Sequence, residues 1–358
     1  MAQQPLLQLE NLKVDFFLRS GKATAIHGLD LQLERGKTLG LVGESGCGKS
    51  LTALAIMGLI SSPGKITGGK IRFDGEDLLK ISERKRRELR GNQISMIFQD
   101  PGSALNPVLT IGKQISEPLR RHKGSSAQQA RDQGLSLLSE VGLPDPERQW
   151  SRYPHELSGG MCQRVMIAMA LACEPALLIA DEPTTALDVT IQVQILHLLR
   201  QLQKQHGMAL LFISHDLRVI AEMADRVAVM YAGDIIEETS VRAIFERPRH
   251  PYTRGLLKSR PSLTETSGQR ERLYHIPGNV PSLQELSEGC RFLDRCPWPG
   301  PDCSVKIPEL LGFSHRSRCY RWFEFPQDTC DDKLLLQRFH PPSAGSTDLL
   351  SYSSRPAR

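Results

Sequence analysis

The chain has 358 residues, of which 24% are charged and 40% hydrophobic, and its formal net charge is +5. This length favours one large domain with a smaller one. Interspersed acidic and basic residues argue against nucleic acid as a partner, while the mild positive excess suits a phosphate-bearing ligand or a membrane surface. We see no signal peptide at the N-terminus, and the longest apolar stretch, residues 166–180, is broken by Glu174-Pro175 and too short to span a bilayer. We therefore expect a soluble, cytoplasmic chain that would serve a membrane only by docking onto another protein.

The first part of the chain predicts strands on both sides of a glycine-rich loop. Apolar and alternating runs at residues 7–17 and 25–33 indicate an antiparallel pair. We then expect, in chain order, a strand at 39–42, a loop at 43–50, a helix to about 59, a turn-rich segment at 64–75 around a short strand at 70–73, a helix at 82–89 and a strand at 94–98.

The second part alternates helices and strands. Residues 101–150 are polar, mainly helical and interrupted by Pro and Gly, which suggests an insert between two strands. Helices are expected at 158–172 and 189–206, and strands at 176–180, 209–213, 227–231 and 234–239. This alternation predicts an α/β fold with a mainly parallel sheet. We divide the chain into a main domain at 1–258, interpreted below as an ATPase domain from its motifs, with its helical insert at about 100–175, an extension at 259–330 and a mobile tail at 331–358.

The loop after the strand at 39–42 has the pattern G-x-x-x-x-G-K-S of a phosphate-binding loop. Glycines let its backbone N–H groups point at a phosphate chain, and the following helix N-terminus adds partial positive charge. Lys49 would reach the β- and γ-phosphates, and the Ser50 hydroxyl would bind Mg²⁺. We predict that the chain binds a nucleoside triphosphate through Gly43, Glu44, Ser45, Gly46, Cys47, Gly48, Lys49, Ser50 and Leu51. Cys47 is expected to pack and not to do redox chemistry.

Two carboxylates, Asp181 and Glu182, end the apolar strand predicted at 176–180. Asp181 would face Mg²⁺, usually through water, as the second half of a triphosphate site. Glu182 would polarise the attacking water as general base.

A second anion-binding terminus is predicted at Leu157-Ser158-Gly159-Gly160-Met161-Cys162-Gln163, where a serine and two glycines begin a helix. With this segment, the chain from Leu6 to about Leu257 resembles the ATP-binding subunits of ABC transporters. The resemblance implies that Ser158, Gly159 and Gly160 act in trans, by completing the nucleotide site of a partner chain. Cys162 departs from the Gln or Arg that is commoner in this signature.

The same resemblance implies roles for four more residues. Gln99 would contact Mg²⁺ and the attacking water, and His215 would hold the γ-phosphate and couple to Glu182. Asp188 would bridge the two chains. Phe16 would stack on adenine, with Phe17 as the alternative because spacing varies there.

Three further segments resemble the dipeptide/oligopeptide import family, which also has nickel and antimicrobial-peptide branches: residues 96–107, 249–257 and 276–278. The resemblance implies a subunit at the cytoplasmic face of the inner membrane that hydrolyses ATP to drive uptake of peptides, or alternatively of nickel or another small solute. The implied partners are a paralogous ATPase subunit, two transmembrane permease subunits and an extracytoplasmic solute-binding protein. A soluble, non-transport ABC ATPase is disfavoured, because the chain has one ATPase unit and no heptad repeat.

Beyond about residue 260 the composition shifts to Pro, Ser, Cys and aromatics, and four cysteines follow: Cys290, Cys296, Cys303 and Cys319. A structural disulfide is not expected in a cytosolic chain, and the spacings are wider than in common zinc or ferredoxin motifs. Spacing alone therefore leaves open a metal site of unknown kind or four unrelated thiols. The resemblance to the C-terminal extension of peptide-importer ATPases implies a [4Fe–4S] cluster on these four residues, with zinc as the second choice. His315 is a possible ligand, although such a histidine is more often a surface residue, and Cys330 has no assigned role.

Overall fold

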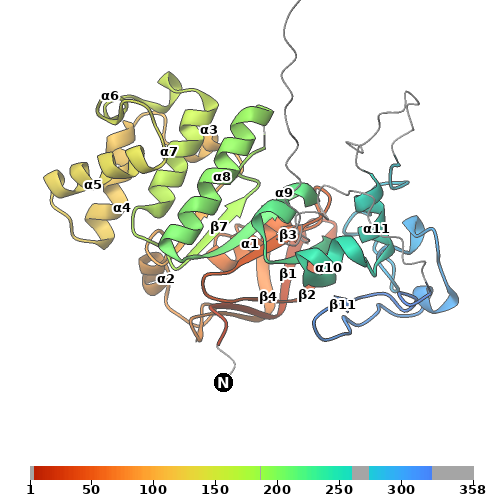
Figure 1. Cartoon of the computed structure of the whole chain (residues 1–358). Helices are drawn as coiled ribbons and strands as arrows, with labels where there is room; N and C mark the ends of the chain where they lie inside the picture. The colour runs from red at the N-terminus through yellow and green to blue at the C-terminus, as the bar shows by residue number, and fades with distance from the viewer. Residues whose placement is uncertain (1–3, 186, 260–273, 325–358) are drawn as a thin grey trace, which may run out of the picture.

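The computed structural model describes residues 4–185, 187–259 and 274–324 (Figure 1). Cys330, the predicted tail at 331–358 and part of the predicted extension, residues 260–273, lie outside the described residues.

The N-terminal strands form an antiparallel sheet in the order β2-β1-β4-β5. Its strands are β1 (Leu7–Leu18), β2 (Gly21–Leu33), β4 (Gly64–Phe73) and β5 (Glu76–Asp77). β1 pairs with β2 along its whole length, so the predicted antiparallel pair is confirmed.

Strand β4 is longer than the sequence indicated. We expected a short strand at 70–73 within a turn-rich segment, but β4 pairs with β1 from Gly64 onward. The register shifts near Gly69, whose φ is +87° and where a Cβ would lie 2.5 Å from the carbonyl oxygen of Glu10. Gly69, which suggested a turn in the sequence, therefore marks an irregularity inside a continuous strand, at a position where no side chain would fit.

The main sheet has the strand order β11-β10-β9-β3-β8-β7-β6. The run from β9 to β6 is parallel, whereas β10 and β11 are antiparallel, which confirms the predicted mainly parallel sheet. The bounds are β3 (Thr38–Val42), β6 (Ile94–Ile97), β7 (Leu177–Asp181), β8 (Ala209–Ser214), β9 (Arg226–Tyr231), β10 (Asp234–Ser240) and β11 (Arg316–Ser317). β11 extends the sheet with residues that follow the predicted ATPase domain, and this strand was not among the predicted elements.

One face of this sheet packs against helices and the other against one helix and the antiparallel sheet, so its strands are buried on both sides. In β7, Leu177 and Ile179 belong to one hydrophobic cluster, while Leu178 and Ala180 belong to the other. The helices that flank the sheet are α1 (Lys49–Met57), α2 (Glu83–Leu89), α8 (Val189–His206), α9 (Leu217–Met223), α10 (Val241–Glu246) and α11 (Pro251–Lys258). A continuous apolar run in the sequence corresponds to this two-sided burial.

A separate group of helices, the helical lobe, connects β6 to β7 and projects away from the C-terminal part of the chain (Figure 1). It contains α3 (Pro101–Ala104), α4 (Ile111–His122), α5 (Ala127–Glu140), α6 (Pro146–Trp150) and α7 (Gly159–Leu171). Trp150 lies against Gly112 of α4 and Gly134 of α5, where an added Cβ would come within 2.3 and 2.4 Å of the indole ring. The two glycines thus let the helices approach one large side chain.

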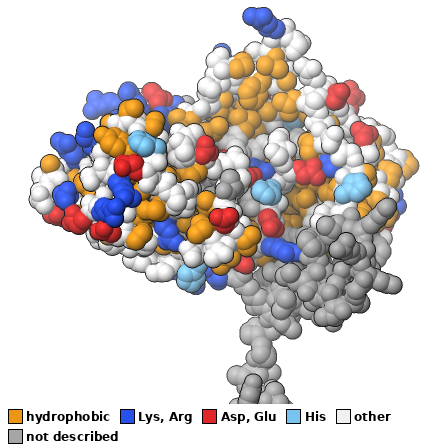
Figure 2. All heavy atoms as spheres, turned by 90° about the horizontal axis from the view of Figure 1, so that it is seen from above, with side chains coloured by type: hydrophobic (Ala, Val, Ile, Leu, Met, Phe, Trp, Pro, Cys, Tyr) orange, Lys and Arg blue, Asp and Glu red, His pale blue; other side chains and the backbone are white. Residues whose placement is uncertain are grey.

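The surface carries charges of both signs. On the face in Figure 2, Lys and Arg side chains gather mostly on the end of the molecule formed by the helical lobe, with Asp, Glu and hydrophobic side chains between them. Short 3₁₀ turns at Pro154–Glu156, Leu293–Arg295 and Pro301–Ser304 complete the described elements. Within the described ranges, no helix is both long enough and apolar enough to cross a membrane.

Replacing Gly134 with Ala should destabilise the helical lobe, because the new methyl group would meet Trp150 at 2.4 Å. We expect the free energy of unfolding to fall by about 1–3 kcal/mol, as measured by urea unfolding. Ser136→Ala, an exposed position on the same helix, is the control and should change it by less than about 0.5 kcal/mol. Equal unfolding midpoints for the two variants would contradict this account of the packing.

Candidate active site

The predicted site residues follow four neighbouring parallel strands at one edge of the main sheet. Val42 is paired with Ser214 and Asp181 with Ile213, so β3, β7 and β8 end at the same level. The loop at 43–50 follows β3, Glu182 follows β7, and His215 follows β8. Because the carboxyl ends of parallel strands meet at one edge, these segments converge there.

The phosphate loop has the shape that its glycines predicted. A Cβ on Gly43 would lie 2.2 Å from the carbonyl oxygen of Met230, and Gly48 has a φ of +108° before α1 begins. Cys47 is buried, and burial raises the pKa of its thiol, which agrees with a packing role. Lys49 Nζ donates to the carbonyl oxygens of Gly43 at 2.9 Å and Glu44 at 3.0 Å. The ammonium group therefore lies within the curve of the loop.

Ser50 and Asp181 form the pair predicted to hold Mg²⁺. The Ser50 hydroxyl donates to Asp181 Oδ1 at 3.0 Å, and the Asp181 residue is only 4% exposed. Burial raises the pKa of the Asp181 carboxyl. A divalent cation is a natural partner for such a desolvated carboxylate, so the donor set fits the predicted ion.

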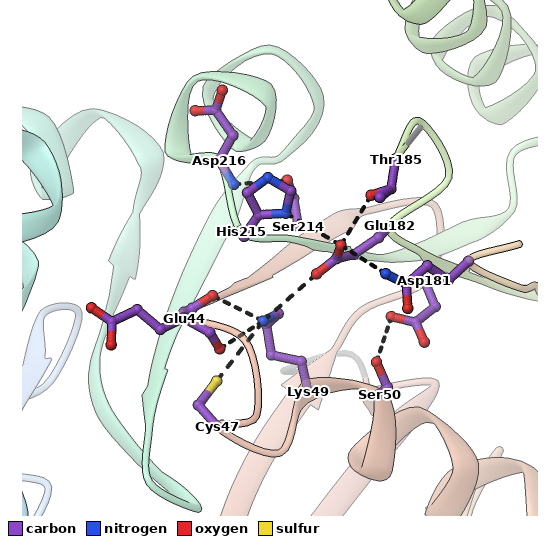
Figure 3. A network of polar contacts seen from close by, with 12 residues as sticks. Glu44, Cys47, Lys49, Ser50, Asp181, Glu182, Thr185, Ser214, His215 and Asp216 are labelled. Atoms are coloured by element: carbon purple, nitrogen blue, oxygen red, sulfur yellow. Dashed lines mark hydrogen bonds and ion pairs between the residues drawn. The ribbon is translucent and has the colours of Figure 1, made fainter. Parts of the chain in front are cut away.

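The carboxylate of Glu182 is the centre of the site (Figure 3). Its Oε2 atom accepts from Thr185 Oγ1 at 3.0 Å and from Gln99 Nε2 at 3.3 Å, and it lies 3.2 Å from His215 Nδ1. Its Oε1 atom is 3.8 Å from Lys49 Nζ. The structure thus places the other three predicted catalytic residues, Lys49, Gln99 and His215, around the carboxylate of Glu182.

These contacts shift the pKa values of Glu182 and His215 in opposite directions. The hydrogen bond with His215 is the main reason that the pKa of Glu182 is lowered, and the Thr185 hydroxyl acts in the same direction. The same bond raises the pKa of His215. Glu182 is therefore held as a carboxylate, the form that a general base needs.

Two contributors to the site were missed by the sequence reasoning. Thr185 lies three residues after Glu182 in the same turn, a spacing that could have suggested its contact. Tyr252 could not have been found in this way: its hydroxyl accepts the backbone N–H of Glu44 at 2.8 Å across 208 residues of sequence. His250, two residues before it, accepts from the Tyr252 N–H at the start of α11.

The signature residues do not join this cluster within the chain. Ser158 is exposed at the N-cap of α7, where its hydroxyl accepts from the Met161 N–H. Gly159 is also exposed, and Gly160 lies against Ile191 of α8, which a Cβ would approach to 2.9 Å. Asp188 is exposed at the N-cap of α8.

The two aromatic candidates for adenine lie on the same strand but differ in exposure. Phe16 is half-buried and packs against the hydrophobic cluster that lies between the antiparallel sheet and the main sheet. Phe17 is 49% exposed, with Lys65 Nζ 5.8 Å from its ring centroid.

The four predicted cysteines of the extension line one small pocket, together with Phe292 and Trp298. Burial raises the pKa of Cys290 to about 11 and of Cys319 to about 12. Across the described ranges, however, no group of three or more His, Cys, Asp or Glu side chains is arranged to hold a metal ion.

His315, expected at the surface, is instead buried, with Nε2 2.7 Å from Glu237 Oε1. A buried carboxylate in β10 is the reason: it needs a polar partner.

Comparison with known proteins places the site in a class. Residues 26–185 match the ABC transporter family. A dimeric ATP-binding cassette solved in a post-hydrolysis state with ADP and phosphate aligns with a TM-score of 0.59 and 28% identity, over 66% of this chain and 98% of that one. The fold is that of an ABC ATPase.

Residues 236–303 match the C-terminal region of oligopeptide/dipeptide transporters. The dipeptide transport ATP-binding protein DppD of Escherichia coli is 47% identical over 88% of this chain and 96% of its own length. The oligopeptide transport ATP-binding protein AppD of Bacillus subtilis is 48% identical over 89% and 97%. The chain belongs to this family of ABC transporter ATP-binding subunits.

Removing the Thr185 hydroxyl with Thr185→Val should disturb the orientation of the Glu182 carboxylate, which this hydroxyl holds. We expect the kcat for ATP in the assembled transporter to fall about threefold to tenfold, because Glu182 loses one of its hydrogen-bond donors. The acidic limb of the pH–rate profile should move to higher pH, since this hydroxyl helps to lower the pKa of Glu182. Thr185→Ser keeps the hydroxyl and should behave like the wild type. A valine variant with unchanged kcat and pH profile would remove Thr185 from the site.

Proposed function

We propose that this chain hydrolyses ATP to drive the import of dipeptides or oligopeptides across the cytoplasmic membrane. The observation that carries the proposal is the convergence of Lys49, Gln99 and His215 on Glu182, beside a phosphate loop. Support for a peptide cargo comes from the relatives named above, because the cargo itself would not touch the ATPase.

Each residue has a task in hydrolysis. The N–H groups of the loop bind the phosphates, and Lys49 exchanges the carbonyl oxygens of Gly43 and Glu44 for phosphate oxygens. Glu182 accepts a proton from the attacking water, while His215 holds the γ-phosphate. Mg²⁺, when bound by Ser50, Gln99 and Asp181, neutralises charge on the phosphates.

The second half of each nucleotide site comes from another chain in this proposal. Ser158 and Gly159 are exposed, and next to Asp188 the apolar side chains Val189 and Val193 are 78% and 59% exposed on α8. Such an apolar, unpartnered surface beside a helix N-terminus suits a seam between two ATPase chains. Two chains would close head-to-tail, each signature facing the partner's ATP.

We propose that the partner chain is a paralogous ATPase, with two transmembrane permease subunits and an extracytoplasmic solute-binding protein completing the transporter. The chain would lie at the cytoplasmic face of the membrane. Adenine would stack on Phe16 or on Phe17, of which Phe17 offers the more exposed ring.

We further propose that the cysteine pocket holds a [4Fe–4S] cluster. Four thiols on one pocket match the donor set of such a cluster. Zinc, which four thiolates can also bind, is the second choice.

Glu182→Gln should abolish turnover while ATP is still bound. The amide cannot accept the proton of water, so we expect ATPase activity in the assembled complex to fall at least about a hundredfold. ATP retention, measured by filter binding, should stay the same or rise, because the phosphate loop is intact.

The control is Glu117→Gln, at an exposed position of α4, which should hydrolyse ATP at the wild-type rate. Undiminished hydrolysis by the Glu182 variant would remove this residue from its role as base.

Metal analysis tests the cysteine site. The complex, purified without oxygen, should contain iron and acid-labile sulfide in equal amounts, and Cys303→Ser should lose both. Cys173→Ser, a buried cysteine in the ATPase domain, should retain them. Zinc without iron or sulfide would show that the cluster is wrong and the second choice right.

A further inference from the structure

Arg295 connects the cysteine pocket to the phosphate loop. It lies in the 3₁₀ turn directly before Cys296 and is 8% exposed. Its guanidinium makes two bonds to one carboxylate: Nη1 donates to Glu44 Oε2 at 2.8 Å and Nη2 to Glu44 Oε1 at 3.1 Å. Nε donates to the carbonyl oxygen of Pro277 at 2.8 Å, which fixes the direction of the fork. The pair spans 251 residues of sequence.

Glu44 is the second residue of the phosphate loop, and each of its polar groups has a different partner. Its N–H donates to Tyr252, its carbonyl oxygen accepts from Lys49, and its carboxylate binds Arg295. Figure 3 shows the carboxylate pointing away from Lys49, on the other side of the loop. The position of the carbonyl that orients Lys49 therefore depends on two side chains, Tyr252 and Arg295, from segments that follow β10 in sequence.

The path from Arg295 to the cysteines is short and packed. Phe292 lines the cysteine pocket and contacts the rings of Tyr231 and Tyr252, with centroids 5.3 and 5.4 Å away. Arg295 also lies over the Tyr231 ring, 5.7 Å from its centroid. A change in the backbone at Cys296 would reach Glu44 through side chains that have little room to move.

A second arginine of the extension, Arg318, attaches the extension to the main sheet without contacting the phosphate loop. Arg318 donates to the carbonyl oxygens of Ile235 at 2.8 Å and Pro308 at 3.0 Å, and so ties the extension to β10 without reaching the loop. Arg295 differs because its partner is a carboxylate inside the ATP site.

We propose that Arg295 is a positioning residue for ATP binding: it holds Glu44, and through it the loop backbone that receives the phosphates, so that the cysteine pocket controls nucleotide affinity. This inference rests on the ATP site of the proposed function, and it holds whatever group the cysteines bind. Removal of Arg295 should therefore weaken ATP binding more than it slows the chemical step at Glu182.

The test compares Arg295→Gln, Arg295→Lys and Arg318→Gln in the assembled transporter. We expect Arg295→Gln to raise the KM for ATP about tenfold with a smaller change in kcat, since a loop that is out of place binds phosphate poorly. Lys can bond one carboxylate oxygen but not both, so Arg295→Lys should recover part of the affinity. Arg318→Gln should lower the melting temperature while leaving the KM for ATP unchanged.

A double-mutant cycle between Glu44→Gln and Arg295→Gln adds a second readout: the double variant should be little worse than either single one. Equal effects of the Arg295 and Arg318 variants on KM would overturn the proposal and leave Arg295 a docking residue. If Arg295→Gln does not fold, Arg295→Lys decides alone, and an unchanged KM is then the negative result. A wild-type complex without ATPase activity would instead overturn the proposed function.

Discussion

The alignment of parallel strand ends is the constraint on which the site depends. β3, β8 and β7 are neighbours in register, so the phosphate loop, His215 and the pair Asp181-Glu182 leave the sheet at one edge. Gln99 reaches the same place from the segment after β6, the next strand along. No single segment could supply these groups, because each one carries only one or two of them. The strand order therefore brings the catalytic side chains together, and the elements packed on both faces of the sheet keep the strands in place.

Within that frame, the charge of Glu182 is set by its neighbours. Its φ of +45° is unusual for a residue with a side chain, and its carboxylate is turned toward His215, Thr185 and Gln99. Asp181, one residue earlier, is more deeply buried, and its pKa shifts the other way. The pKa values of two adjacent carboxyls are thus shifted in opposite directions, because hydrogen bonds dominate at Glu182 and loss of water dominates at Asp181. This difference suits a base beside a metal ligand.

The sequence predicted what is local and failed where contacts are long-range. The strand ends and the phosphate loop were predicted because each follows from a short pattern that the fold preserves. β4 was misread because Gly69 can mark either a turn or a bulge, and only pairing with β1 decides between them. His315 was expected at the surface because its partner, Glu237, is 78 residues away in sequence. For the same reason, no pattern near residue 295 could indicate a bond to Glu44.

The segment His250-Pro251-Tyr252 shows how a pattern with little chemistry of its own acquires a function. Pro251 begins α11, His250 caps it, and the turn of the chain directs Tyr252 to the N–H of Glu44. Arg295 arrives at the same residue from the cysteine turn. The inner side of the loop is fixed by the core, where Met230 leaves no room for a side chain at Gly43. Its outer side is fixed by Tyr252 and Arg295, which follow β10 in sequence. A loop that is held from both sides binds phosphates with little loss of conformational entropy, and either support can then change the affinity.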